Sequence, residues 1–145
     1  MQIFSELQRN SSNQIFIRLL IVYFVNFFGS FSPFFPIMLG LFLLCENFFI
    51  SLIFVILFSY FHNFSLLFFV LVFFINKFVL LDRLKDIVDF HYQDAVALFV
   101  VYFFLGVYLY NFANLETFLL IVYLIYNYAF DLIVIRLLKC ELKSY

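Results

Sequence analysis

Residues 66–75 read LLFFVLVFFI, without one polar side chain. A strand of a membrane β-barrel would alternate apolar and polar residues over about ten positions. A run that is apolar at every position is instead typical of a helix buried in lipid. Similar stretches recur from Ile15 to Leu138 with no long polar insertion. The sequence therefore predicts an all-α, polytopic membrane protein.

The composition supports a membrane location. The chain has 145 residues, of which 68% are hydrophobic, and its mean hydropathy is +1.14. A soluble domain of this size could not bury so much apolar surface. A formal net charge of -1 offers no basic field for nucleic acid. We therefore expect a single integral membrane domain over residues 1–145, in contact with membrane lipids and not with nucleic acid.

The apolar stretches divide into six expected membrane passes. They cover residues 15–31, 34–45, 48–61, 64–80, 94–110 and 117–138. The polar residues 1–14 are expected to form a short cytoplasmic leader. A cleaved signal peptide is the alternative for the first apolar run, but Pro33 would then follow the cleavage site directly, a position that cleavage tolerates poorly. A bundle of six transmembrane helices is the predicted fold.

The number of passes before residue 81 is decided by charge. Three passes between residues 34 and 81 place Lys77, Arg83 and Lys85 in the cytoplasm, whereas two passes would export them. The positive-inside rule favours three passes, with Lys77 near the membrane surface, where its side chain can snorkel to water. All eight Lys and Arg residues then lie on the cytoplasmic side, together with both termini: Arg9, Arg18, Lys77, Arg83, Lys85, Arg136, Lys139 and Lys143.

Residues 79–91, VLLDRLKDIVDFH, predict a short amphipathic helix between the fourth and fifth passes. Leu80, Leu84, Ile87 and Val88 recur at helical spacing, and the charged residues fall mostly on the opposite face. Such a helix is expected to lie on the cytoplasmic membrane surface. Its charged face is interpreted as solvated, with a docking site for a cytoplasmic partner as the alternative.

The last apolar segment carries the candidate site residues Tyr123, Asn127, Asp131 and Arg136. The first three are spaced by four residues and form one polar stripe on a helix. A carboxylate within a membrane helix costs about 2.5–3.5 kcal/mol, so Asp131 should face protein or water rather than lipid. The stripe predicts a packing network in which Asp131 reaches toward Arg136; binding of a partner helix and proton or ion handling are the alternatives.

The sequence shows no recognisable catalytic motif. It contains no G-x-S-x-G, H-E-x-x-H, Walker loop or C-x-x-C pattern. His62 and His91 are expected on opposite sides of the membrane, and neither has a second His or a Cys at metal-ligand spacing. We therefore expect no enzymatic activity, no cofactor and no metal site.

This layout resembles the MreD family of bacterial rod-shape proteins. The likeness rests on chain length and tightly spaced passes, on the Pro-bearing SPFFP at residues 32–36, and on YNYAFDL at 126–132 running into RLLK at 136–139. At 59–62, where the family commonly carries Gly and Asp, this chain has SYFH. The resemblance implies a scaffold of the cell-shape and elongation machinery in the bacterial inner membrane, beside an MreC-like bitopic partner.

Two other functions stay open. The bundle that the resemblance implies is similar to the substrate-binding subunits of vitamin transporters, which would make the protein a small-molecule-binding transporter subunit. A cavity lined by polar groups would favour that hypothesis. The third hypothesis is an accessory subunit of an organellar respiratory complex, because 27 Phe residues and no Trp would be unsurprising in an A- and T-rich organellar genome.

Overall fold

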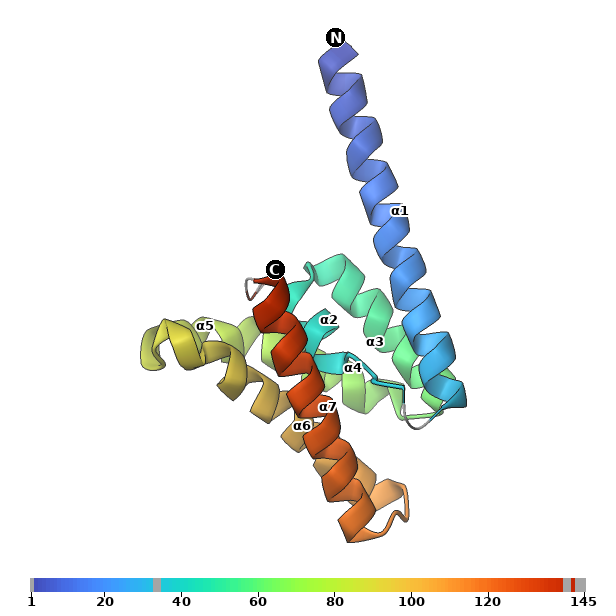
Figure 1. Cartoon of the computed structure of the whole chain (residues 1–145), viewed down its shortest axis with the longest axis vertical. Coiled ribbons are helices and arrows are strands. Elements are labelled where there is room, and N and C mark those ends of the chain that lie inside the picture. Colours follow the sequence, from blue (N-terminus) through green and yellow to red (C-terminus); the bar gives the residue numbers. More distant parts are fainter. Residues whose placement is uncertain (1, 33–34, 140–141, 143–145) are drawn as a thin grey trace.

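The computed structural model describes residues 2–32, 35–139 and 142, with the side chains of residues 3–11 left aside (Figure 1). Pro33 and Phe34 of the SPFFP segment, Lys143, and the side chain of Arg9 lie outside this description. The described chain is all-α. Its elements are α1 (Gln2–Phe31), α2 (Leu39–Cys45), α3 (Phe48–His62), α4 (Leu66–Phe74), the π-helical η1 (Ile75–Leu80), α5 (Leu81–Ile87), the 3-10 turn η2 (Phe90–Tyr92), α6 (Gln93–Phe112) and α7 (Thr117–Leu138).

Polar residues between the apolar segments set the helix ends. The side chain of Asn47 accepts a hydrogen bond of 3.0 Å from the backbone N–H of Ile50 and so caps the start of α3. Asn63 ends α3 in the left-handed conformation, with φ of 56°. The hydroxyl of Ser65 then caps α4. These residues form helix ends because Asn and Ser side chains can replace missing intrahelical partners.

Three helical stretches of the described chain are long and apolar enough to cross a membrane. They are Ser12–Phe31, Phe90–Phe112 and Thr117–Leu138, and they indicate an integral membrane protein. The expected bundle of six passes is not supported. The second expected pass forms only the seven residues of α2, which rise about 10 Å against a hydrocarbon core of about 30 Å. Helix α3 has fifteen residues and rises about 22 Å.

Helix α2 is the centre of the fold rather than a membrane pass. It contacts α3, α6, α7 and η1, and nearly all of its residues are buried. An all-apolar helix of this length has no polar face to present to water. Non-helical backbone at membrane depth is tolerated where protein surrounds it, and here residues 35–38 lead into α2 without forming a helix.

Helix α1 lies apart from the others in Figure 1 and packs chiefly against α3. Among the side chains of α1 that the structure describes, Val22, Asn26 and Gly29 are buried. The rest of the stretch Ser12–Phe31 is exposed or only partly buried. The helix begins at Gln2, so the expected leader at residues 2–14 is helical and continuous with the first apolar segment.

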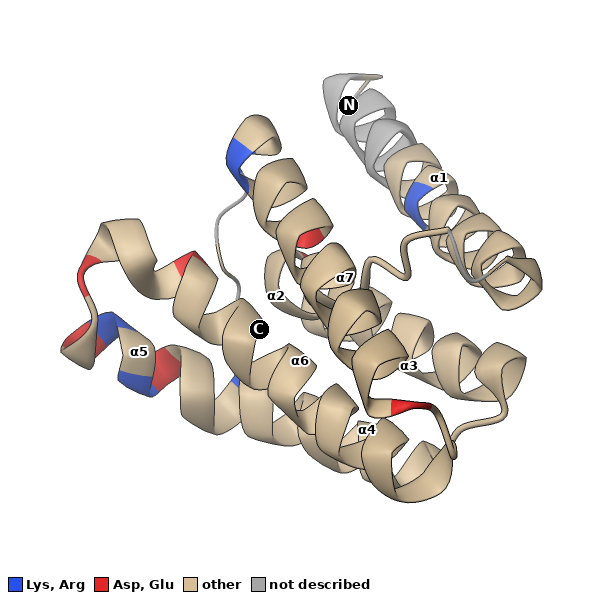
Figure 2. Ribbon diagram, turned by 60° about the horizontal axis from the view of Figure 1, so that its bottom comes forward, with Lys and Arg blue, Asp and Glu red and all other residues tan. Residues whose placement is uncertain are grey.

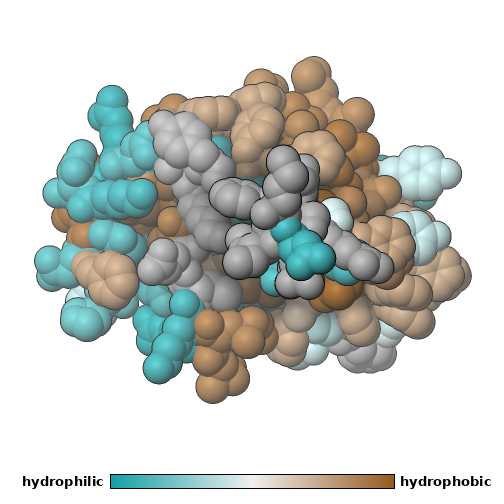
Figure 3. Space-filling view, turned by 90° about the horizontal axis from the view of Figure 1, so that it is seen from above, coloured by the Kyte–Doolittle hydropathy of each residue, from teal (hydrophilic) through white to brown (hydrophobic). Residues whose placement is uncertain are grey.

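No separate helix begins at residue 79. Instead, α4, η1 and α5 follow one another without a break, and the chain turns only at Val88, which is extended. In α5, Leu81 and Leu84 are buried, and the charged residues are exposed. Figure 2 shows these charges grouped on α5 and the turn after it, and Figure 3 shows hydrophilic side chains gathered on that side of the molecule.

Candidate functional site

Asp131 of α7 holds the N-terminus of α2. Its Oδ2 accepts a hydrogen bond of 3.0 Å from the backbone N–H of Gly40 and a second bond from the hydroxyl of Tyr102 on α6. Asp131 is 0% exposed. The first N–H groups of a helix lack intrahelical partners and carry partial positive charge, so a carboxylate there is stabilising. Asp131 therefore caps α2 from a different helix and joins α2, α6 and α7.

Asn127, one helical turn before Asp131 on α7, makes a similar contact to the segment that leads into α2. Its Oδ1 accepts a hydrogen bond of 3.1 Å from the backbone N–H of Ile37, and its Nδ2 donates to the carbonyl of Tyr123 at 2.9 Å. The Tyr123 ring is partly buried against the core. The polar stripe of α7 thus faces the protein interior, and its partners are backbone groups of the segment that leads into α2.

Arg136 lies apart from this network. Its Nε donates to Oδ2 of Asp94 at 3.1 Å, and its side chain is exposed. The expectation that Asp131 reaches toward Arg136 is therefore wrong. Asp94 lies in the first turn of α6 and also accepts a hydrogen bond from the backbone N–H of Ala95 at 2.8 Å. The ion pair therefore joins the end of α7 to the beginning of α6.

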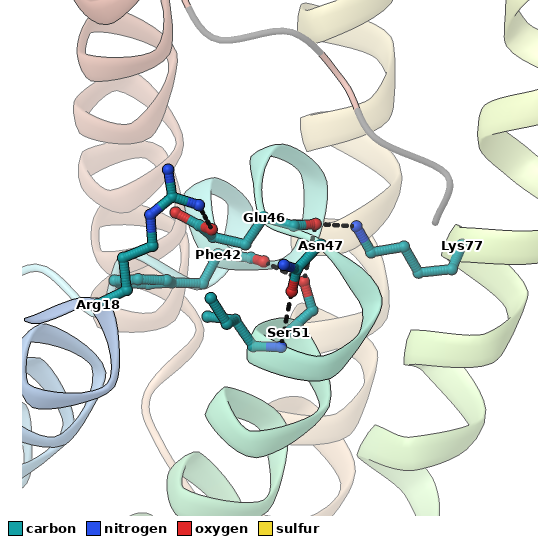
Figure 4. Close-up of polar contacts among 7 residues, drawn as sticks. Arg18, Phe42, Glu46, Asn47, Ser51 and Lys77 are labelled. Atoms are coloured by element: carbon teal, nitrogen blue, oxygen red, sulfur yellow. Dashed lines mark hydrogen bonds and ion pairs between the residues drawn. The ribbon is translucent and has the colours of Figure 1, made fainter. Parts of the chain in front are cut away.

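A second polar cluster closes the opposite end of α2 (Figure 4). The ammonium group of Lys77 donates to the carbonyl of Glu46 at 2.7 Å, and the hydroxyl of Ser51 donates to the carbonyl of Phe42 at 2.7 Å. Arg18 of α1 forms an ion pair of 3.2 Å with the carboxylate of Glu46. Because the carbonyls at a helix C-terminus carry partial negative charge, a cation there is stabilising.

Lys77 is 0% exposed, so the expectation that it snorkels to the membrane surface is wrong. It lies within the π-helical η1. A π-helical turn closes i→i+5 bonds and thereby rotates the residues after it relative to an α-helix. Both Asn76 and Lys77 are buried in this turn, and the lysine points toward α2 instead of water.

The two clusters lie at the two ends of the seven-residue helix α2. At each end, the helix is contacted by a side chain whose charge is opposite to the partial charge of the helix dipole there. Asp131 lies at its N-terminus and Lys77 near its C-terminus. Gly40, Tyr102 and Glu46 complete these contacts, and none was singled out by sequence reasoning as a partner of Asp131 or Lys77. The one signal in the sequence was the glycine at position 40 within an apolar run, which can mark a close approach of neighbouring helices. The structure shows that approach, because a Cβ at Gly40 would lie 2.9 Å from Asp131 Oδ2 and overlap Leu98.

An open cavity of about 1070 Å³ lies where α7 ends and α6 begins. Side chains from α5, η2, the first turn of α6 and the end of α7 line it: Lys85, Phe90, His91, Tyr92, Gln93, Asp94, Ile135, Arg136, Lys139 and Leu142. Within the part of the chain that the structure describes, no group of three or more His, Cys, Asp or Glu residues could hold a metal ion. The lining of the cavity mixes basic, aromatic and aliphatic groups with a carboxylate and an amide.

The chain matches no protein-family model, and neither a curated protein nor a solved structure matches it.

Proposed function

We propose that the protein is a non-enzymatic membrane scaffold, MreD-like, that docks the transmembrane helix of a bitopic partner in the cell-shape and elongation machinery of the bacterial inner membrane. The observation that carries this proposal is the free face of α1. Among the exposed apolar residues of α1, five share one face with alternating spacings of four and three: Ile17, Ile21, Phe24, Phe28 and Phe31.

This spacing is the a/d pattern by which two helices pack along a shared seam. Helix association in lipid depends on close van der Waals packing rather than on burial from water. The opposite face of α1, at Val22, Asn26 and Gly29, is already buried. A partner helix on the exposed seam would therefore complete the packing of α1 on both sides.

The proposed orientation places both termini in the cytoplasm. Arg18 and Lys77 both contact Glu46, so the middle of α1, the end of α2 and η1 meet at one level. At another level, the hydroxyl of Tyr108 accepts a hydrogen bond of 2.8 Å from the backbone N–H of Ser65, which joins the turn after α3 to the end of α6. The first group contains the cations, which the positive-inside rule assigns to the cytoplasm.

The test is recovery of the partner with variants of the seam. Phe24 and Phe28 are stacked with centroids 6.2 Å apart, and Phe99 and Phe103 on α6 form a matched exposed pair at 6.3 Å. Phe24→Ala with Phe28→Ala should reduce by at least about tenfold the recovery of a bitopic protein encoded upstream, whereas Phe99→Ala with Phe103→Ala should leave it unchanged. The tenfold figure corresponds to about 1.4 kcal/mol, within the range of one aromatic contact.

Depletion of the protein gives the cellular arm of the test. Rod-shaped cells should become round, with wall insertion delocalised and with respiration and vitamin uptake intact. Equal partner recovery from both double variants, or normal shape after depletion, would refute the scaffold proposal.

The transporter-subunit alternative is favoured by one observation, the cavity lined partly by polar groups. Its lining residues come from helix ends rather than from the middle of the helices. A loss of small-molecule uptake on depletion, with normal cell shape, would establish this alternative in place of the scaffold.

A further inference from the structure

We propose that the cavity between α5, η2 and the ends of α6 and α7 binds the phosphate of an anionic phospholipid headgroup. The proposal does not depend on the scaffold function. It starts from charge: Lys85, Arg136 and Lys139 line the cavity together with His91, and Asp94 is the acidic residue among the described lining residues.

The cations are not all used within the protein. Asp94 pairs with Arg136 through Nε. The two Nη groups of this guanidinium form no hydrogen bond or ion pair with the residues that the structure describes. For Lys85 and Lys139, likewise, the described part of the chain supplies no ion pair. A guanidinium with two lysines provides the donors that a phosphate diester needs, since Arg binds phosphate as a planar fork and Lys as a point charge.

The cavity lies at the boundary between membrane and water. It is formed where the candidate spans Phe90–Phe112 and Thr117–Leu138 begin and end, respectively. Exposed Leu137 and Leu138 continue the apolar surface of α7 up to this point. Basic pockets between transmembrane helices on the cytoplasmic side are suited to anionic lipid headgroups.

The remaining lining residues select a lipid over a soluble phosphate. Phe90 and Tyr92 are exposed aromatic side chains, and the partly exposed Leu142 adds aliphatic surface to the same cavity. The amphipathic ring of a Tyr favours the headgroup level of a bilayer. A free phosphate would use none of these groups, whereas the glycerol and upper acyl chain of a phospholipid would contact them.

The experiment uses the full chain in nanodiscs of phosphatidylcholine, with phosphatidylglycerol added stepwise and bound lipid measured by native mass spectrometry. Lys85→Gln and Lys139→Gln should each weaken phosphatidylglycerol binding about fivefold, and the double variant about twenty-fivefold. The matched control is Arg83→Gln, which removes one charge from an exposed position of α5 outside the lining set and should leave binding unchanged. Asp94→Asn should strengthen binding, because it removes the carboxylate that pairs with Arg136 and keeps an oxygen that can accept from the backbone N–H of Ala95.

A second arm separates the two sources of phosphate. Inorganic phosphate in large excess should not displace phosphatidylglycerol; displacement would show that the cavity takes a soluble anion and would overturn the lipid proposal. Equal weakening by Arg83→Gln and Lys85→Gln would also overturn it, because general surface charge would then explain the binding. Unchanged melting temperatures in pure phosphatidylcholine show that each variant is folded.

Discussion

The carboxylate of Asp131 accepts a hydrogen bond of 3.0 Å from the backbone N–H of Gly40, which lies 91 residues earlier in the chain. The same oxygen accepts the hydroxyl of Tyr102. One side chain thus joins three helices inside a membrane protein, where no water is present to form hydrogen bonds with a polar group that lacks a protein partner.

Replacing Asp131 by Leu removes the acceptor for both donors. Each buried donor left without a partner costs about 1–3 kcal/mol, so Asp131→Leu should lower the free energy of unfolding by at least about 2 kcal/mol. Unfolding in mixed detergent micelles measures this loss. Leu132→Ala, at the neighbouring partly buried position, should cost less, and Asp131→Asn should fall between them because it keeps one acceptor. Equal losses for Asp131→Leu and Leu132→Ala would mean that the network contributes nothing specific.

Gly40 is required by the close approach of α2 to α6 and α7. A Cβ at this position would overlap Leu98 and lie 2.9 Å from Asp131 Oδ2, so Gly40→Ala should destabilise the protein by about 1–3 kcal/mol through overpacking. Gly29→Ala is the control, because the nearest atom to its Cβ would be 3.7 Å away on His62 and Ala favours a helix over Gly by about 0.5–1 kcal/mol. Thermal unfolding should therefore show opposite signs for the two changes.

Lys77 should resist chemical modification while the protein is folded. It is fully buried with its ammonium on the Glu46 carbonyl, whereas Lys85 and Lys139 are exposed. Treatment of the micellar protein with an amine-reactive ester, followed by peptide mass spectrometry, should modify the two exposed lysines and spare Lys77. Modification of all three at similar rates would contradict the position of η1; denatured protein provides the reference for full reactivity.

The proposed orientation is tested by cysteine accessibility. Cysteines placed at Asn63 and at Ala113 should react with an impermeant reagent added outside intact cells, because these positions follow α3 and α6. A cysteine at Lys85 should react only after the membrane is opened. External labelling of position 85 would reverse the proposed sidedness of α5.

The sequence predicts helix positions well where apolar runs are long. The runs at 94–110 and 117–138 are matched by α6 and α7, which are also candidate membrane spans. The run at 34–45 was expected to cross the membrane, whereas the structure has only the short interior helix α2 within it. The prediction was wrong because the length of an apolar run cannot distinguish a short membrane pass from a segment enclosed by protein. Its enclosure depends on groups supplied by α6, α7 and η1.

The sequence predicted the α7 residues of the candidate site but not their partners. The spacing of Asn127 and Asp131 indicated a face turned toward protein, but their partners are the backbone N–H groups of Ile37 and Gly40. Backbone donors leave no pattern of residue types in the sequence. The position of Lys77 was missed for a related reason, since the π-helical turn that rotates it inward cannot be recognised from apolar spacing.

The capping of α2 from α7 also orders the biogenesis of the protein. During synthesis α2 leaves the ribosome long before Asp131 and Asn127, and until then the N–H groups of Gly40 and Ile37 lack their acceptors. A chain whose elongation stops before α7 would hold those donors beside lipid, where they are costly. The packing around the start of α2 is therefore completed only when α7 inserts, and we expect a chain stalled before α7 to have an incompletely packed interior.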